Sequence, residues 1–271
     1  ELPPDMAVPP TVAGQTLRIL MLEDDPVAGA ATEGWLTARG HLVTRVESIA
    51  RGVEEARQGG FDLALIDLDL EDGDGREAIR QIRGLADPVH AGLPVIVASG
   101  RADALDSSDP GLLGWLVKPF GGADLEAALS PLLRAGLPGP AAHAPWMSGA
   151  EGQGAELAAA MSADGLQALF DSAADQIARS AAILATPRAG RDRQRSAAHR
   201  LAGTAAIVGL DRLSAEARAF EAALGAASGG PSAEDRDQLL RHAEAGRATL
   251  LQGRGSESGA ERRSDALTGA E

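Results

Sequence analysis

Five short apolar runs, separated by amphipathic stretches, constrain the fold more than any other feature of this 271-residue sequence. The runs cover residues 17–22, 41–46, 61–66, 93–98 and 114–117. Each has the length and composition of a β-strand, and helix-like segments with stop signals such as Gly40 and Gly59 lie between them. Only the segment before the fifth run, with Pro110 and several glycines, predicts a weak or distorted helix. This alternation predicts a parallel sheet covered by helices on both faces.

The rest of the sequence divides into a linker and a helical region. Residues 136–154 are rich in Pro, Gly and Ala and predict a linker. The helices predicted beyond it would form an antiparallel four-helix bundle, at 163–185, about 190–209, 211–227 and 232–251. The expected division of the chain is an N-terminal extension over 1–15, an α/β domain over 16–135, the linker over 136–154, a helical domain over 155–252 and a disordered tail over 253–271.

The composition argues against several classes of partner and compartment. A net charge of −14 and only 3% aromatic residues disfavour nucleic acid, because phosphate binding needs clustered basic side chains and base stacking needs aromatics. The absence of cysteine removes disulfides and thiolate chemistry and favours the cytoplasm. No apolar run is long enough to predict a membrane segment. The first residue is Glu rather than Met, so we expect that the sequence was cut from a longer protein.

Charged and polar side chains follow four of the predicted strands. They are Glu23 and Asp24 after the first strand, Asp67 after the third, Ser99 after the fourth, and Lys118, the only lysine of the chain, after the fifth. The carboxyl ends of parallel strands form one edge, where α/β sheets bind their ligands, so we expect these side chains to meet there. The neighbouring Asp25 is expected only to cap the helix that follows it.

This set of residues suits magnesium-dependent phosphoryl chemistry. Carboxylates gathered this closely repel one another unless a cation lies among them, and an all-oxygen ligand set suits Mg²⁺. Asp67 is central and is the candidate nucleophile for a phosphoryl group, whose oxygens the metal, Lys118 and Ser99 would neutralise. A compact ammonium reaches into a narrow acidic site better than a planar guanidinium does. The alternative interpretation is that the acids only cap helix N-termini.

Residues 16–135 resemble the response regulator receiver domain. The motifs of that family occur in order as LMLEDD, LALIDLDLEDGDG, VIVASG and LVKPF. The resemblance implies a flavodoxin-like fold with a five-stranded parallel sheet in the order 2-1-3-4-5, and phosphorylation of Asp67. The other roles that it implies are Mg²⁺ ligands from Glu23, Asp24, Asp67 and the main-chain carbonyl of Asp69, and phosphate contacts from Ser99 and Lys118.

Two features depart from the receiver pattern, and other interpretations stay open. Leu70 and Glu71 stand where the family has Met-Pro, and the segment before the lysine is short. Trp115 occupies the place of the family's switch aromatic, although plain core packing is equally expected for a buried aromatic. DLDLE is also similar to the motif of haloacid dehalogenase-like phosphatases, but those enzymes have further metal-binding acids after the lysine. A pseudo-receiver that only binds is the third alternative.

The segment RSAAHRLAGTAAIVG, residues 195–209, places a histidine on one of the predicted bundle helices. Leu201, Ala205 and Val208 form the stripe expected to be buried. The residues expected to face outward are His199, Arg195, Ala202 and Gly203. Glycine costs about 1 kcal/mol relative to alanine inside a helix, and here it would leave space for another protein to approach the imidazole. The other four histidines have no comparable setting.

The helical region resembles the histidine-containing phosphotransfer domain, which implies that His199 carries a phosphoryl group. Ala202 replaces the family's lysine, so Arg195 or Arg200 is expected to contact the phosphate instead. A basic surround, complementary to the acidic rim of the first domain, is expected from Arg188, Arg191, Arg193, Arg195 and Arg200.

Together the two resemblances predict a phosphorelay protein that corresponds to the C-terminal part of a hybrid sensor histidine kinase. An upstream histidine kinase core and a downstream receiver are the implied partners, and the sequence contains no ATP-binding kinase core of its own.

Overall fold

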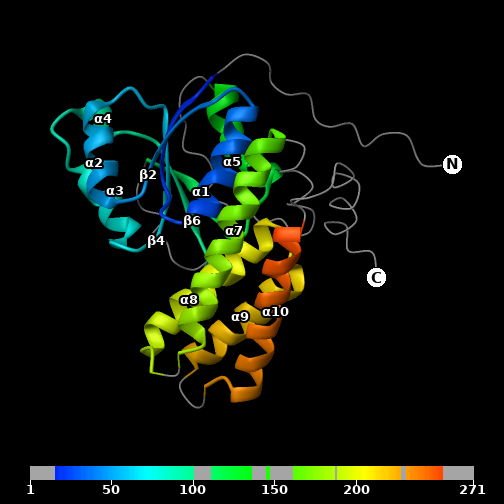
Figure 1. Ribbon diagram of the computed structural model, residues 1–271. Coiled ribbons are helices and arrows are strands. Elements are labelled where there is room, and N and C mark those ends of the chain that lie inside the picture. The colour runs from blue at the N-terminus through cyan, green and yellow to red at the C-terminus, as the bar shows by residue number, and fades with distance from the viewer. Residues whose placement is uncertain are drawn as a thin grey trace.

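The computed structural model describes residues 16–100, 111–135, 145–146, 161–186, 188–226 and 230–252 (Figure 1). The predicted extension over 1–15, the tail over 253–271, most of the predicted linker and the segment 101–110 lie outside the described residues. An α/β half and a helical half are both present, and the second packs beside the first (Figure 1).

The first half contains the predicted parallel sheet. Its strands are β1 (Arg18–Leu22), β2 (Leu42–Val46), β3 (Leu63–Asp67), β6 (Val95–Ser99) and β7 (Leu112–Val117). Its helices are α1 (Pro26–Ala38), α2 (Ile49–Gln58), α3 (Gly75–Arg83), α4 (Pro88–Ala91) and α5 (Gly122–Ala135). The strand order β2-β1-β3-β6-β7 with parallel pairing confirms the predicted flavodoxin-like fold.

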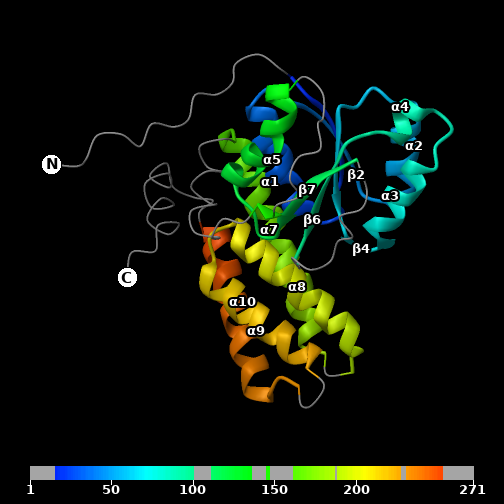
Figure 2. The ribbon, with the colours of Figure 1, turned by 180° about the vertical axis from the view of Figure 1, so that it is seen from behind.

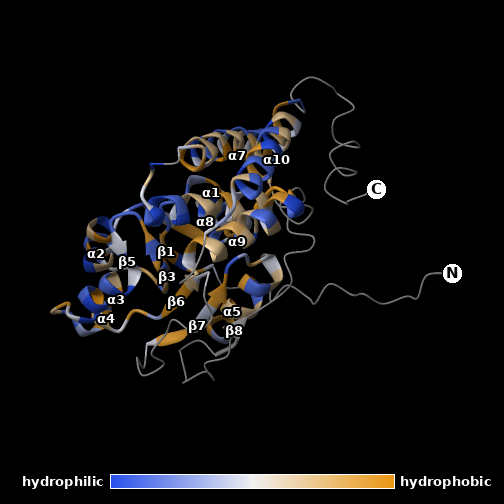
Figure 3. Ribbon diagram, turned by 90° about the horizontal axis from the view of Figure 1, so that it is seen from below, coloured by the Kyte–Doolittle hydropathy of each residue, from blue (hydrophilic) through white to orange (hydrophobic). Residues whose placement is uncertain are grey.

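Buried aliphatic side chains hold the helices on the two faces of the sheet. Because strand side chains alternate, Leu20 and Ile66 pack with α2 and α3, whereas Ile19 and Leu65 pack with α1 and α5. Every residue of β3 and β6 is buried, as expected for central strands of a covered parallel sheet. Each fully buried Leu, Ile or Val side chain of these strands contributes roughly 1.5–3 kcal/mol. Figure 3 shows the hydrophobic strands between helices whose outer sides are largely hydrophilic.

Three very short strands were not predicted. β4 (Asp69–Leu70) and β5 (Gly73–Asp74) form an antiparallel hairpin directly after β3. β8 (Pro145–Trp146) pairs in parallel with β7 at the edge of the sheet, inside the segment predicted to be a linker. An edge strand of two residues needs only main-chain groups, so composition gives no signal for it.

The second half is the predicted four-helix bundle. Its helices are α7 (Ala163–Leu184), α8 (Arg191–Ile207), α9 (Asp211–Gly225) and α10 (Ala233–Gln252). Leu201, Ala205 and Val208 are buried as predicted. The prediction that Ala202 faces outward is wrong, because Ala202 is only 3% exposed and belongs to the core of the bundle. A small side chain there lets α9 approach, and the Ser214 hydroxyl donates a hydrogen bond to the Ala202 carbonyl at 2.9 Å.

Helix α1 is shared between the two halves. On its sheet side, Trp35 and Leu36 pack into the core between α1 and α5. On its other side, Val27 and Ala31 belong to the same buried cluster as the bundle residues. The helix contacts both α7 and α8, and the bundle therefore lies against the α/β half along α1 (Figures 1 and 2).

Within the part of the chain that the structure describes, no helix combines the length and apolar character that a bilayer crossing requires.

Candidate functional site

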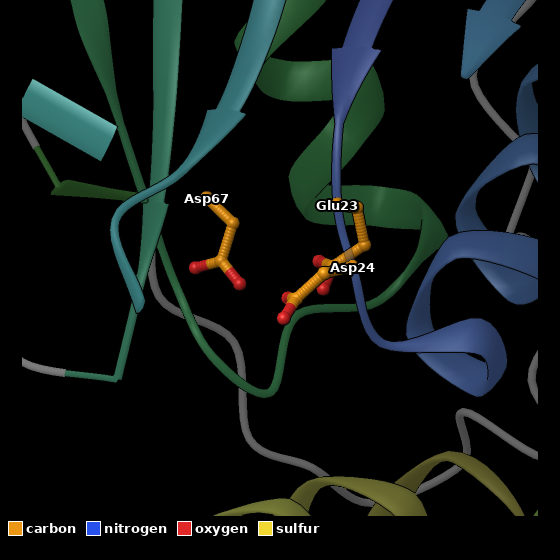
Figure 4. Close-up of side chains that lie close together, drawn as sticks. All are labelled: Glu23, Asp24 and Asp67. Atoms are coloured by element: carbon orange, nitrogen blue, oxygen red, sulfur yellow. The ribbon is translucent and has the colours of Figure 1, made fainter. Parts of the chain in front are cut away.

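Three carboxylates meet at the carboxyl edge of the sheet. Glu23 and Asp24 lie in the loop between β1 and α1, and Asp67 is the last residue of β3. One oxygen from each lies within 4.8 Å of the other two (Figure 4). Glu23 and Asp67 are only 5% and 4% exposed, so water does little to screen their mutual repulsion.

Lys118 lies between two of these acids. Its Nζ donates hydrogen bonds to Oε2 of Glu23 at 2.6 Å and to Oδ2 of Asp67 at 2.8 Å. Burial alone would lower the pKa of Lys118, but the carboxylates of Asp67 and Glu23 outweigh it and raise that pKa above its usual range. Burial likewise acts to raise the pKa of Asp67, and the ammonium of Lys118 more than reverses this, so that the pKa falls below its usual value. Lys118 therefore keeps Asp67 ionised.

The pKa of Glu23 shifts in the opposite direction to that of Asp67. Burial raises its pKa to about 8, the nearby Asp67 carboxylate adds to this effect, and Lys118 opposes it. Burial also raises the pKa of Asp24, again with a contribution from Asp67. The raised pKa values of Glu23 and Asp24, beside the ionised Asp67, indicate that this site lacks positive charge. Three oxygen donors at this spacing fit a hard divalent cation.

The hairpin β4–β5 is tied to this acidic loop. The backbone N–H of Glu71 donates to Oδ2 of Asp24 at 2.8 Å, and the N–H of Asp69 donates to Oδ1 of Asp67 at 3.2 Å. The family has proline at the position of Glu71, and proline has no N–H to donate. The departure from the family pattern thus supplies a hydrogen bond to a candidate metal ligand.

The two remaining predicted residues at this edge belong to β6 and β7. Ser99 is the last residue of β6 and is 3% exposed, and its carbonyl accepts a hydrogen bond from the N–H of Lys118 at 2.8 Å. Trp115 packs partly buried against the core on the α2 and α3 side, as plain core packing predicts. Its indole N–H is buried without a hydrogen-bond partner among the described residues.

Asp25 does more than the predicted capping. Its Oδ1 accepts hydrogen bonds from the N–H groups of Val27 and Ala28, both at 2.9 Å, which caps α1 as expected. Its Oδ2 accepts a third, at 2.9 Å, from Nε2 of Gln176 on α7. Asp25 therefore also joins the α/β half to the bundle.

His199 lies on α8 with its side chain 35% exposed and paired to α9. Its Nδ1 lies 3.2 Å from Oε2 of Glu221. That hydrogen bond raises the pKa of His199, while burial acts to lower it. When the imidazole is neutral, a carboxylate at Nδ1 fixes the proton on that nitrogen and leaves the Nε2 lone pair free. A Cβ at Gly203 would meet nothing within 4 Å, which agrees with the space predicted there.

One cavity of about 170 Å³ connects the two groups of residues. It is lined by residues of the acidic edge, including Asp67 and Lys118, and by His199, Gly203 and Glu221 of the bundle. The acidic edge and the histidine therefore belong to one site between the two halves.

The interface beside this cavity has complementary charges. A second cavity, of about 430 Å³, is lined by Asp24, Asp25 and Glu71 from the α/β half and by Arg179, Arg193 and Arg200 from the bundle. Arg200 Nη1 lies 3.4 Å from Oε1 of Glu71. Of the predicted basic surround, Arg193 and Arg200 thus face the acidic rim, while Arg195 lies 3.9 Å from Glu221.

Several residues of this site were missed at the level of sequence. Gly100, Arg218 and Glu221 belong to the site itself, and Gln176 lies at the interface beside it. Gln176 carried a signal, because it is a polar residue on the apolar stripe of α7 and is 5% exposed. Gly100, Arg218 and Glu221 gave none, since their importance depends on how two helices and two domains meet.

The fold and the site together define a class of protein. An ionised aspartate beside a buried lysine, in a flavodoxin-like domain that faces a histidine on a four-helix bundle, is the arrangement of a phosphorelay signalling protein. Comparison with known families agrees: residues 19–130 match the response regulator receiver domain and residues 164–249 match the Hpt domain. The chain contains a receiver domain followed by an Hpt domain, and the haloacid dehalogenase-like alternative is not favoured.

Individual relatives match the receiver part. The KDP operon transcriptional regulatory protein KdpE of Escherichia coli is 36% identical over 119 residues, which cover 43% of this chain and 51% of KdpE. The transcriptional regulatory protein CseB of Streptomyces coelicolor is 36% identical over 126 residues, which cover 45% of this chain and 51% of CseB. The chain thus spans about half the length of these curated relatives.

Among solved structures, the receiver domain of a sensor histidine kinase from Pseudomonas aeruginosa PAO1, with magnesium in its active site cleft, is similar. It is 30% identical with a TM-score of 0.38, and the match covers 44% of this chain and 98% of that one.

Proposed function

We propose that the receiver domain accepts a phosphoryl group on Asp67 and that the Hpt domain carries a phosphoryl group on His199. The observation that carries this proposal is the shared cavity, in which an ionised carboxylate held by Lys118 lies on the receiver side and an imidazole lies on the Hpt side. Acids that only capped helices would need neither a buried ammonium nor a histidine opposite them.

Asp67 acts as the nucleophile. One carboxylate oxygen attacks the phosphorus of the donor, an O–P bond forms, and the donor's leaving group departs with the electron pair of the broken bond. Lys118 supports this step because it lowers the pKa of Asp67 and keeps the carboxylate ionised. The ammonium of Lys118, which lines the cavity, is expected to neutralise the oxygens of the transferred group, and the hydroxyl of Ser99, the last residue of β6, is expected to donate a hydrogen bond to them.

The carboxylates of Glu23, Asp24 and Asp67, with the main-chain carbonyl of Asp69, would hold a Mg²⁺ ion. The donor set fits, since all of its ligands are oxygens and three of them lie within 4.8 Å of one another. When bound, Mg²⁺ supplies positive charge to the phosphoryl oxygens. The hydrogen bond from Glu71 to Asp24 orients one of the ligands.

On the Hpt side, Glu221 prepares the imidazole. A proton held on Nδ1 by Glu221 leaves Nε2 as the nucleophile for phosphorus and stabilises the positive charge that develops on the ring. Of the two arginines expected to replace the family's lysine, Arg200 lines the cavity, whereas Arg195 does not line it and lies 3.9 Å from Glu221. Arg218 is a further basic side chain in the lining.

A histidine kinase is the partner class that these two domains imply. We further propose that a second receiver takes the phosphoryl group from His199, that the sequence belongs to the C-terminal part of a hybrid sensor histidine kinase, and that the relay operates in the cytoplasm. The division at residues 16–135, 136–154 and 155–252 is proposed as the domain plan, and limited proteolysis within 136–154 that leaves two stable fragments is its test.

Incubation with Mg²⁺ and radiolabelled acetyl phosphate tests the two sites. Label stable to acid but not to base is expected on Asp67, and label stable to base but not to acid is expected on His199. Asp67→Asn abolishes both when acetyl phosphate is the donor, whereas His199→Gln abolishes only the second. Failure of the wild-type protein to take up label or to bind beryllofluoride with Mg²⁺ would instead support the pseudo-receiver, and continuous release of phosphate from esters would support a phosphatase.

A further inference from the structure

The Hpt histidine touches the receiver at one residue that carries no side chain. Gly100 follows Ser99 at the end of β6, and a Cβ built there would lie 2.6 Å from Cε1 and 3.4 Å from Nε2 of His199. Real Cβ atoms do not approach other atoms as closely as 2.6 Å, so the imidazole can occupy this position only against glycine. The ring also interacts electrostatically with Asp69 and Lys118 of the receiver.

A relay of hydrogen bonds fixes the bundle beside this contact. Nη2 of Arg179 donates to Oε1 of Gln176 at 2.7 Å, which orients the amide so that its Nε2 donates to Oδ2 of Asp25. Asp25 follows Glu23 by two residues, and it accepts hydrogen bonds from two N–H groups at the N-terminus of α1. The receiver's acidic loop and the Hpt helix α7 are therefore connected through the buried Gln176, which bonds to the half-buried Asp25 and the exposed Arg179.

An ion pair and an apolar contact complete the surface. Glu71, whose N–H bonds to Asp24, places its carboxylate 3.4 Å from Arg200, the residue after His199. Val27 and Ala31 of α1 are 0% and 6% exposed, because they pack into the cluster of bundle side chains. Shape, charge and apolar burial thus agree on one docked arrangement. We call this contact the docking face, and its residues are Gly100, Asp25, Glu71, Val27 and Ala31 on the receiver and His199, Gln176 and Arg200 on the Hpt domain.

We propose that Asp67 and His199 exchange a phosphoryl group within one chain, across this docking face. The inference rests on the proposed function of the two residues and adds the partner: the chain's own receiver. In the exchange, Nε2 of His199 attacks the phosphorus of the Asp67 acyl phosphate and an N–P bond forms. The Oδ–P bond breaks, Asp67 recovers its carboxylate and electron pair, and the ring proton stays on Nδ1 beside Glu221. The reverse step returns the group to Asp67.

Exchange within the chain is unimolecular, and this property gives the test. Tethered groups experience effective concentrations of about a millimolar, so at micromolar protein the internal reaction dominates over collisions between chains. After phosphorylation with labelled acetyl phosphate and rapid removal of the donor, we expect label to move from Asp67 to His199 at a first-order rate. That rate should stay constant over a roughly hundredfold dilution of the protein.

Mixing two single variants provides the complementary measurement. Asp67→Asn chains retain only the histidine, and His199→Gln chains retain only the aspartate. With labelled His199→Gln chains as the donor at micromolar concentration, label should reach the Asp67→Asn chains at less than about a tenth of the wild-type rate. Equal rates in the mixture and the wild type, or a wild-type rate proportional to concentration, would overturn the inference.

Two substitutions test the docking face itself. Gly100→Ala puts a methyl group where the imidazole lies, and the ratio of label on His199 to label on Asp67 should fall at least about tenfold. Gln176→Ala removes the bond to Asp25 from the Hpt side, and it should slow the exchange while Asp67 still accepts label from acetyl phosphate at the wild-type rate.

The outcomes separate this inference from the proposed function. An unaltered exchange in both Gly100→Ala and Gln176→Ala overturns the docking face, as does a labelled Asp67 that never delivers label to His199 of its own chain. If neither residue takes up label from any donor, the proposed function fails as well.

Discussion

At the scale of single residues, the site depends on titratable side chains whose protonation states are set by particular neighbours. Lys118 holds Asp67 ionised, Glu221 holds a proton on His199, and Glu23 is the carboxyl group left with a raised pKa of about 8. The sequence identified Glu23, Asp67, Lys118 and His199 because each lies at a strand end or in a helix motif. Glu221 could not be identified, because no local pattern on α9 distinguishes it from an ordinary surface acid.

The pairing of His199 with Glu221 predicts a shift in the pH dependence of phosphotransfer. The nucleophile is the neutral imidazole, so transfer to His199 should rise with pH through the pKa of His199. The hydrogen bond to Glu221 raises that pKa, hence Glu221→Gln should lower it and move the rising limb to lower pH. Asp69 and Lys118 also face the ring and act in opposite directions.

Stopped-flow or rapid-quench profiles between about pH 5 and 9 would measure this shift, with the pKa of His199 followed by NMR. Glu216→Gln is the matched control, since Glu216 pairs with His242 on the far side of α9. A rising limb that stays in place in Glu221→Gln would contradict the assigned role.

The buried ammonium predicts a second effect, on stability. Lys118→Met removes the charge but keeps most of the length, and it leaves the ionised carboxylate of Asp67 buried without its counter-charge. Without Mg²⁺, the free energy of unfolding should fall by about 3 kcal/mol at pH 8. The loss should be smaller at pH 5, because burial raises the pKa of Asp67 once the opposing ammonium is gone, so that Asp67 can take up a proton and lose its buried charge.

Urea denaturation in the presence of a chelator, followed by tryptophan fluorescence, would measure the effect, since all three tryptophans lie between residues 35 and 146. Added Mg²⁺ should recover part of the loss by binding only the folded variant. An equal loss at both pH values would contradict the explanation.

At the scale of elements, close packing between β3 and α3 positions Asp67, the proposed phosphoryl acceptor. The N–H of Gly75 donates to the carbonyl of Leu68 at 3.0 Å, and a Cβ at Gly75 would lie 2.0 Å from the carbonyl oxygen of Asp67. A backbone oxygen cannot move aside as a flexible side chain can. The helix can therefore begin this close to the acceptor strand only because it begins with glycine.

Gly75→Ala should accordingly lower the free energy of unfolding by about 2–3 kcal/mol and slow the labelling of Asp67. Gly84→Ala, at the other end of α3, is the control, because a Cβ there would meet its nearest atom at an ordinary 3.5 Å. That change should leave stability equal or raise it by up to about 1 kcal/mol. Urea denaturation would measure the free energy of unfolding of both variants. Comparable losses in Gly75→Ala and Gly84→Ala would contradict the packing argument.

Elements were the level at which the sequence was most informative. Apolar runs and helix stops predicted the five long strands and all four bundle helices, since buried faces impose their period on the sequence. The two-residue strands β4, β5 and β8 were not predicted, because main-chain pairing of that length leaves no pattern in the sequence. The outward orientation assigned to Ala202 was wrong because alanine is compatible with either face, and only the approach of α9 decides between them.

At the scale of the whole molecule, the receiver and the bundle share one helix. Helix α1 covers the sheet with Trp35 and the bundle with Val27 and Ala31. The sequence predicted a basic surround of His199 that complements the acidic rim of the receiver, but it gave no information on which helix faces would meet. A docked Hpt domain also covers most of the His199 side chain, so the proposed second receiver and the chain's own receiver would compete for it.

A charge introduced into the shared helix should therefore release the Hpt domain. Ala31→Glu would bury a carboxylate among Hpt side chains without a partner, and the domains should separate instead. We expect a larger radius of gyration by small-angle X-ray scattering, slower exchange within the chain and faster transfer from His199 to an added receiver domain. Ala50→Glu, at an exposed position of α2, is the control and should change none of the three. A compact Ala31→Glu protein would contradict the prediction.

Gly100 gives this molecule a point at which a substitution of one carbon atom should uncouple its two domains. Because a methyl group there would lie where the imidazole packs, the variant should keep both domains folded and weaken the exchange between them. Cells that carry Gly100→Ala would show whether signalling requires phosphoryl exchange between the two domains of one chain or only one of the domains.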